Sequence, residues 1–367
     1  MKKKYFENLD GLRFVAFLGV FLYHHNYLFA DFFKNHRLTS VLFDQGETAV
    51  SFFFVLSGFL ISYILMIEKQ NRTQINLINF FKKRILRILP LYFLIVLVGF
   101  VFIPMMTQGL THSSFHVNES IQFYLLFGAN FDQINLLSAL IENSRSLSIL
   151  WSIAVEEQFY LIWPFLLFLV PLKRLLILFI VIIAGSLAFK VLHRTDDLIL
   201  HFHTFSVISD LVIGSAIAWL YIYSKPFFKF FENLNKYAIA LAYIAGVILI
   251  FANEYFPIIE RYRILLPLFW AFVILEQCIS KNSLFKVSRS KLLSKLGTIS
   301  YGCYMYHGIV MTSSNLILFK QTTFYLPGSD LLKTGVIGLN LAATTGISYL
   351  SYKYFESFFL NLKQKKV

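Results

Sequence analysis

Long runs of apolar residues alternate along this chain with short polar connections. A run of roughly 18 to 22 residues is long enough to cross a hydrocarbon layer of about 30 Å as a helix. We therefore expect an all-α fold, a polytopic transmembrane bundle of about ten helices that forms a single domain over 1–367. The predicted spans cover 9–29, 47–67, 88–107, 149–170, 174–192, 203–223, 237–253, 263–280, 297–318 and 334–359.

The placement of basic residues predicts how this bundle lies in the membrane. With the N-terminus inside, most of the 33 Lys and Arg residues fall in the segments assigned to the cytosol. Cytoplasmic connections of membrane proteins collect Lys and Arg, so both termini are expected to be cytosolic. The opening Met1-Lys2-Lys3-Lys4 is interpreted as the start of a retained first span, because Asp10 and Arg13 interrupt the apolar stretch that follows.

Composition and charge agree with a membrane protein. The chain is 57% hydrophobic, which requires lipid as its solvent. Its net charge of +13 invites a nucleic-acid partner, yet the charge is dispersed over short connections instead of forming one groove, so no nucleic acid is expected. Cys278 and Cys303 fall in apolar runs and are predicted to be core residues.

Ionisable residues inside the predicted spans are candidates for function, because burying them in hydrocarbon costs a few kcal/mol each. They are Arg13, His24, His25, Glu156, Glu157, Asp210, Glu276 and His307.

The first span places two of these residues on one helix face. Residues eleven apart differ by about 20° in azimuth and about 16 Å in height, so Arg13 and His24 share a face. His25 lies about 120° away from Arg13 and is predicted to be a packing or interfacial residue.

Depth estimates bring His24 and Glu156 to the same level of the bundle. The first span runs outward and the fourth begins near the outer face, so both residues are expected in the outer half. A carboxylate beside an imidazole fixes its tautomer and raises its basicity, as a general base requires. A structural ion pair between two helices is the alternative.

Two further groups of polar residues are candidates. Ser300, Tyr304 and His307 form a polar stripe on the ninth span, which predicts either interhelical hydrogen bonds or a substrate-lining surface. Arg84 and Arg87 precede the third span. Juxtamembrane charge of this kind sets topology and binds anionic membrane lipid, and the guanidinium forks also suit a diphosphate at a cytosolic mouth.

Four segments together resemble the acyltransferase type 3 family of membrane O-acyltransferases. They are Asp10-Gly11-Leu12-Arg13 continuing to Tyr23-His24, then Phe53 to Leu60, then Arg84 to Pro90, then Leu150 to Tyr160, with Ser300 to His307 as a late motif. The resemblance covers essentially the whole chain. It implies a multi-pass enzyme of the bacterial cell inner membrane that takes an acyl group, usually acetyl, from coenzyme A and places it on a hydroxyl of a cell-surface glycan or a similar acceptor.

The resemblance also implies site residues. The arginine and histidine of the family's first motif match Arg13 and His24, and its later basic pair matches Arg84 and Arg87. Its tryptophan, serine and glutamate segment matches Trp151, Ser152 and Glu156. Many members carry a basic residue shortly before the glycine of the sixth span, whereas the segment from Ser206 to Gly214 contains Asp210 and no basic residue.

Taken together, these residues predict one mechanism. Acetyl-CoA is expected to enter from the cytosol with its phosphates near Arg84, Arg87 and Arg13. His24, oriented by Glu156, is expected to deprotonate the acceptor hydroxyl or to carry the acyl group itself. Residues expected to support the carbonyl or the acceptor are Asp10, Trp151, Ser152, Tyr160, Ser300, Tyr304 and His307.

Two other classes of membrane protein also bury ionisable residues. A proton-coupled transporter or flippase of a glycan precursor would also bury His, Arg and Glu in a helix bundle, but the chain shows no internal repeat. A metal or haem site at His24-His25 is not expected, because adjacent residues point to different helix faces.

Overall fold

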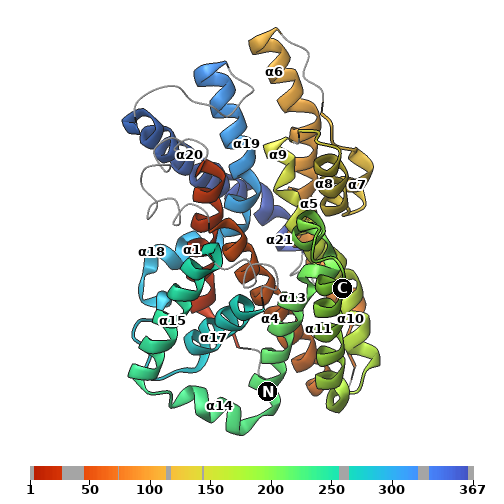
Figure 1. The fold of residues 1–367 in the computed structure, drawn as a ribbon, viewed down its shortest axis with the longest axis vertical. Helices are drawn as coiled ribbons and strands as arrows, with labels where there is room; N and C mark the ends of the chain where they lie inside the picture. Colours follow the sequence, from red (N-terminus) through yellow and green to blue (C-terminus); the bar gives the residue numbers. More distant parts are fainter. Residues whose placement is uncertain are drawn as a thin grey trace. The chain divides into compact units, whose positions relative to one another are not determined.

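A computed structural model of the chain describes residues 4–26, 45–72, 74–112, 117–142, 144–255, 264–320 and 330–362 (Figure 1). Every regular element within these ranges is a helix, which confirms the all-α prediction. Residues 1–3, 27–29 and 263, on which parts of the sequence predictions fall, lie outside the described residues.

The chain divides into two compact units, each assembled from three separate stretches of sequence. Unit 1 comprises Met1–Ala16, Glu47–Leu77 and Glu156–Gly297, and unit 2 comprises Phe17–Gly46, Ile78–Val155 and Thr298–Val367. The first helix, α1 (Glu7–His25), and the helix α10 (Leu150–Leu169) each begin in one unit and end in the other.

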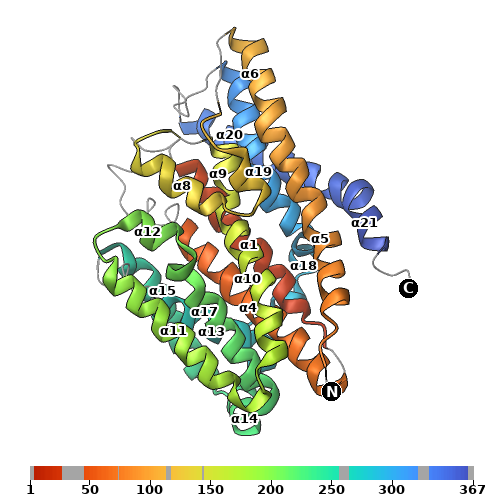
Figure 2. The same ribbon diagram turned by 90° about the vertical axis from the view of Figure 1, so that its right-hand side faces the viewer.

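Unit 1 contains most of the long apolar helices. Besides its parts of α1 and α10, it holds α4 (Gly46–Arg72), η3 (Leu172–Arg174), α11 (Leu175–Leu192), α12 (Asp197–Phe202), α13 (Thr204–Tyr223), α14 (Lys225–Glu232), α15 (Lys236–Tyr255), α17 (Leu265–Ile279), η4 (Val287–Arg289) and α18 (Lys291–Thr298). In the side view, α11 runs beside α13 (Figure 2).

Small residues let α4 and α13 approach closely. A Cβ atom added at Gly58 would overlap the carbonyl oxygen of Leu211, and one added at Gly214 would overlap that of Val55. Close contact of this kind replaces the hydrophobic driving force that helices lack in lipid. Glycine is therefore required at both positions for packing.

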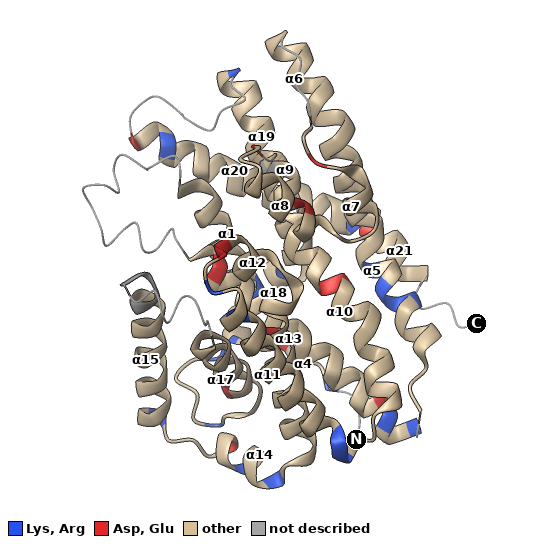
Figure 3. Ribbon diagram, turned by 45° about the vertical axis from the view of Figure 1, so that its right-hand side comes forward, with Lys and Arg blue, Asp and Glu red and all other residues tan. Residues whose placement is uncertain are grey.

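Four connections of unit 1 lie at one of its ends. Lys281 pairs with Glu232 at 3.0 Å, which joins the connection after α17 to the end of α14. The Nζ of Lys4 donates to the carbonyl of Cys278, and Trp219 Nε1 donates to the carbonyl of Leu172. Figure 3 shows basic residues on α14 and beside the N-terminus at this end of the unit. With the N-terminus inside, the predicted topology assigns all four to the cytosolic side, which stays a prediction.

A tight turn joins the helices of the fourth and fifth predicted spans. The 3₁₀ turn η3 follows Pro171 and joins α10 to α11. Lys69 stabilises the end of α10 by donating from Nζ to the carbonyls of Leu167 at 2.6 Å and Val170 at 2.8 Å. A cation at a helix C-terminus satisfies carbonyls that have no partner in the helix itself.

Unit 2 holds the remaining helices. Besides its parts of α1 and α10, it contains α5 (Leu77–Leu97), η2 (Val98–Phe102), α6 (Ile103–Thr111), α7 (Ile121–Leu125), α8 (Ala129–Ser138), α9 (Arg145–Ser148), α19 (Ser300–Phe319), α20 (Asp330–Leu350), η5 (Ser351–Glu356) and α21 (Ser357–Leu362). The segments η2 and η5 are π-helical turns, a distortion that is frequent at functional sites.

The ten predicted spans fall largely on these helices, and two of the differences in their boundaries bear on the site. The helix of the third span begins at Leu77, well before the predicted start at residue 88, because charged residues end a hydrophobic run without breaking a helix. Lys82, Lys83, Arg84 and Arg87 therefore lie within α5 and not ahead of it. The ninth span begins at Ser300, since α18 ends at Thr298.

Length and hydropathy identify five segments that can cross a membrane among the described residues. They are 46–72, 77–111, 146–169, 172–192 and 197–223. The helices α14 and α15, bent by 91°, pass the same test as a pair. The count of ten spans, the cytosolic placement of both termini and the single-domain organisation stay predictions.

Candidate active site

Two histidines from distant parts of the sequence meet in unit 2. His24, in the last turn of α1, places Nδ1 3.1 Å from Nε2 of His307 on α19. The ring centroids are 5.0 Å apart and the planes are tilted by 36°. His307 is fully buried, whereas His24 is only partly buried. The pair therefore has one fully buried member and one that is partly exposed.

The hydrogen bonds of His307 determine the tautomers of the pair. Its Nδ1 lies 2.5 Å from the carbonyl oxygen of Tyr304, which only accepts, so Nδ1 carries the proton. In neutral His307 the other nitrogen, Nε2, is then an acceptor, and His24 donates to it from Nδ1. Nε2 of neutral His24 consequently carries a lone pair. This arrangement is that of a general base whose orientation is fixed by a second residue.

His25 has a packing role. Its Nδ1 donates to the carbonyl of Phe21 at 2.8 Å, and Nδ2 of Asn340 donates to its Nε2 at 3.0 Å. Both ring nitrogens are thus used by protein groups, and the side chain is fully buried. The interpretation of His25 as a packing residue is confirmed.

The polar stripe of the ninth span faces the interior. Ser300, Tyr304 and His307 are all buried on α19. The hydroxyl of Tyr304 lies 2.6 Å from Oγ of Ser152 at the start of α10, and it also donates to the carbonyl of Ile149 at 3.3 Å. These contacts hold α19 in place against the 149–152 segment, and with it the carbonyl that orients His307. Trp151, also of unit 2, is half-buried.

The basic residues of α5 lie near the beginning of α19. Tyr301 donates to the carbonyl of Ile88 at 3.0 Å, one residue after Arg87. The guanidinium of Arg84 stands 5.9 Å from the ring of Phe80. From Tyr301 to His307 the rise along a helix is about 9 Å. Arg84, Arg87 and the histidine pair are therefore parts of one unit, roughly two helical turns apart along α19.

Glu356 is a charged residue that sequence reasoning overlooked. It ends the π-helical turn η5, accepts a hydrogen bond from Ser351 at 3.2 Å and interacts electrostatically with Arg87. Tyr306 in turn donates to Ser351 at 3.0 Å. The position of Glu356 inside the last predicted span was a signal for this residue, because ionisable residues inside spans are candidates for function, as Glu156 was.

The remaining predicted residues belong to unit 1. Arg13 pairs with Asp10 one turn earlier in α1, and the hydroxyl of Tyr5 donates to the same carboxylate. Glu156 accepts hydrogen bonds from Ser57 at 2.9 Å and from Tyr160 at 2.6 Å. His24 and Glu156 fall in different units, so their pairing stays a prediction. In the structure the His24 ring lies against His307.

Asp210 is the centre of a buried network in unit 1. Ser51 donates to its carboxylate at 2.6 Å, and Ser209 donates to it at 3.2 Å. Nζ of Lys190, on the neighbouring helix α11, donates to Ser209 at 3.3 Å and is buried. A basic group thus reaches the Ser206–Gly214 segment from another helix, although the segment itself has none.

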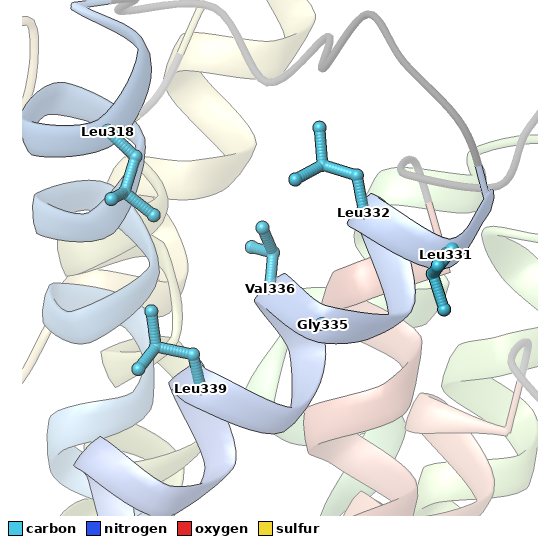
Figure 4. A pocket seen from close by; sticks show the side chains of 6 residues that line it. All are labelled: Leu318, Leu331, Leu332, Gly335, Val336 and Leu339. Atoms are coloured by element: carbon cyan, nitrogen blue, oxygen red, sulfur yellow. The ribbon is translucent and has the colours of Figure 1, made fainter.

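An apolar groove lies between the end of α19 and the start of α20. It has a volume of about 470 Å³ and is lined by Leu318, Leu331, Leu332, Gly335, Val336 and Leu339. Figure 4 shows Leu318 pointing from α19 across the groove toward Val336 of α20. Its lining has no titratable side chain, so the groove supplies no acid or base.

Comparison with known proteins identifies the class to which this fold and site belong. Residues 6–353 match the profile of the family described as the acyltransferase domain, and the chain belongs to that family. The match spans both units. Together with the long apolar helices, it makes the chain a multi-pass membrane protein of the acyltransferase class.

Curated relatives carry more specific names. Peptidoglycan O-acetyltransferase OatA of Listeria monocytogenes is 29% identical over 97% of this chain and 56% of its own length. Putative peptidoglycan O-acetyltransferase YrhL of Bacillus subtilis is 28% identical over 85% of this chain and 49% of its own. O-acetyltransferase OatA of Staphylococcus aureus is 25% identical over 96% and 57%. The chain spans about half the length of these relatives. No solved structure matches it significantly.

Proposed function

We propose that this protein is an O-acetyltransferase of the bacterial cell inner membrane, which moves an acetyl group from cytosolic acetyl-CoA to a hydroxyl of a cell-surface glycan. Membership of the acyltransferase family supports the reaction class. The names of the relatives, which are peptidoglycan O-acetyltransferases, favour a cell-wall glycan as the acceptor. The observation that carries the proposal is the His24–His307 pair, because acyl transfer to a hydroxyl requires an oriented base.

The pair performs the proton transfers of the reaction. Nε2 of His24 takes the proton of the acceptor hydroxyl while the hydroxyl oxygen attacks the thioester carbonyl. The C–O bond forms, the C–S bond breaks, and the departing thiolate receives the proton back from His24. Atoms and charges then balance, with acetylated glycan and free coenzyme A as products.

His307 stabilises the charged state of His24 during this cycle. When His24 becomes an imidazolium, its Nδ1–H still donates to Nε2 of His307, and the Tyr304 carbonyl holds His307 in the accepting tautomer. A hydrogen bond from a charged donor is roughly twice as strong as a neutral one, so the contact strengthens as the proton is transferred. In this proposal His307 fills the orienting role that the sequence assigned to Glu156.

The donor is expected to bind from the α5 side of unit 2. Arg84 and Arg87 provide planar guanidinium groups suited to phosphate oxygens. The pantetheine arm extends along α19 for about two turns to reach His24. Arg13 remains a predicted contributor from unit 1, where Asp10 already neutralises part of its charge.

Purified protein in proteoliposomes tests the proposal. With radiolabelled acetyl-CoA and cell-wall glycan strands, the wild type should transfer label to glycan, and His24→Ala should lose roughly 10²-fold to 10⁴-fold in rate. The matched control is His112→Asn, because His112 is an exposed histidine with positive φ that ends α6, a conformation that asparagine also adopts. Near-normal transfer by His24→Ala, or movement of unmodified glycan across the membrane without acetylation, would refute it.

A further inference from the structure

The helices α19 and α20 pack as an antiparallel pair, and two contacts fix their register. Near the start of α19, Tyr306 donates to Ser351 at the end of α20. At the other end of α19, Leu318 lines the apolar groove with Val336 of α20. The two helices run in opposite directions. Each residue of α19 between these two points can therefore be matched, by its height along the helix, to a residue of α20.

Three buried polar side chains between these contacts have unmet hydrogen-bonding atoms. They are Asn315 on α19 and Asn340 and Thr344 on α20, each at most 2% exposed. Within the described parts of the chain, no hydrogen-bond partner lies within reach of Nδ2 of Asn315, Oδ1 of Asn340 or Oγ1 of Thr344. Burying a polar atom without a partner is unfavourable, and such atoms in a folded protein call for an explanation.

One of the three side chains contacts the chain neighbour of the candidate base. Nδ2 of Asn340 donates to His25, which is the chain neighbour of His24. Thr344 follows Asn340 by one turn of α20, which brings it to the level of α19 just beyond His307. By the same register, Asn315 lies near the level of Asn340, about two turns beyond His307. In this register the three side chains lie along α19 between the level of His307 and the apolar groove.

The chemistry of these atoms indicates the kind of ligand. An amide nitrogen donates, an amide oxygen accepts, and a hydroxyl does both. None of the three groups is charged, and Lys333, on the same face of α20, lies beside Asp330 at 3.8 Å. A neutral, hydroxyl-rich molecule matches such a set, because each of its hydroxyls both donates and accepts. A phosphate or carboxylate does not.

We propose that Asn315, Asn340 and Thr344 form the acceptor subsite, which binds sugar hydroxyl groups and holds one of them at the His24–His307 pair. The subsite rests on the proposed acetyl transfer and adds to it the side of the bundle from which the acceptor is held. Donor phosphates at Arg84 and Arg87 and acceptor hydroxyls at Asn315 then approach the histidine pair from opposite directions along α19.

Two nearly isosteric substitutions test the subsite. Thr344→Val removes the hydroxyl, and Asn315→Leu removes the amide. Thr345→Val is the matched control, since this adjacent hydroxyl donates to the carbonyl of Leu341 within its own helix at 2.8 Å. The probes are acetyl-CoA and a soluble tetrasaccharide of alternating N-acetylglucosamine and N-acetylmuramic acid, with KM measured separately for each, together with the thermal stability of each variant.

The expected result is a rise of roughly tenfold or more in KM for the tetrasaccharide in both variants, with KM for acetyl-CoA unchanged. Thermal stability should stay equal or rise, because an unpartnered buried group has been removed. The control should match the wild type in all three measurements.

Other outcomes overturn the subsite in distinguishable ways. An unchanged KM for the tetrasaccharide refutes it while leaving acetyl transfer intact. A fall in the thermal stability of Thr344→Val assigns this residue a packing role, and a rise in KM for acetyl-CoA assigns the residues to the donor; each refutes the subsite. A wild type that acetylates neither the tetrasaccharide nor intact glycan strands refutes the proposed function itself.

Discussion

The α4–α13 interface of unit 1 and the α19–α20 interface of unit 2 both bury polar side chains, but they treat them differently. Between α4 and α13, Ser51 donates to Asp210 at 2.6 Å and Ser62 donates to Ser215 at 2.7 Å. Between α19 and α20, Asn315 and Thr344 keep atoms without partners among the described residues.

A glycine brings the helices close at each of the two interfaces. On α13, Gly214 lets the helix lie directly against the backbone of α4. On α19, Gly302 faces α20, and a Cβ atom added there would stand 3.1 Å from the Cβ of Ser348. The first interface is closed by backbone contact and paired hydroxyls. The second combines close packing with the hydrogen bond from Tyr306 to Ser351, and it leaves buried polar atoms without partners among the described residues. Buried polar residues in a membrane bundle therefore serve as structural links where they are paired and as candidate binding groups where they are not.

The largest effect is expected from filling the closed interface. Gly214→Ala puts a methyl group onto the carbonyl oxygen of Val55, and overpacking against backbone should destabilise the fold by about 3 kcal/mol or more. Thermal unfolding in detergent measures this. Gly185→Ala on α11 is the control: a methyl group there meets no atom within 4 Å, so stability should hold or rise by about 0.5–1 kcal/mol. Equal behaviour of the two variants would contradict the glycine contact.

A smaller effect is expected from replacing His307, the buried histidine of the pair in unit 2. His307→Phe removes the acceptor for the Nδ1–H of His24, and the acetyl-transfer rate should fall about 10-fold to 100-fold, as for residues that orient a reacting group. His307→Gln keeps an oxygen acceptor and should recover part of the rate. The pH–rate profile of His307→Phe should also shift, because the imidazolium of His24 loses its partner. An unshifted profile with normal rate would show that His307 only packs.

The smallest effect is expected from deleting single hydroxyl groups. One variant removes a hydroxyl that has a hydrogen-bond partner, and the other removes a hydroxyl that has none among the described residues. Ser51→Ala removes one of the donors to the buried Asp210 carboxylate and should lower stability by about 1–3 kcal/mol. Thr344→Val should leave stability equal or higher. Thermal unfolding measures the change in stability of both variants. A loss in Ser51→Ala without a loss in Thr344→Val would confirm that the two interfaces differ, whereas equal losses would show that they do not.

Much of this protein follows from the sequence alone. Apolar runs of spanning length predicted helices along the chain, and their existence depends only on consecutive residues and the hydrocarbon they meet. The cost of burying charge selected His24 and His307 as candidates before any contact was known. The polar stripe of Ser300, Tyr304 and His307 followed from helical spacing, and the structure buries all three on one helix.

Only the tertiary structure decided which of these residues meet. Glu156 was chosen as the partner of His24 from depth along two helices, but depth leaves the lateral position of each helix undetermined. The observed contact joins His24 to a residue 283 positions away, and the tautomer that makes His24 a base follows from a third group, the Tyr304 carbonyl. Asn315 and Asn340 gave no sequence signal, because an uncharged amide costs little to insert and acquires meaning only when packing leaves it without a partner.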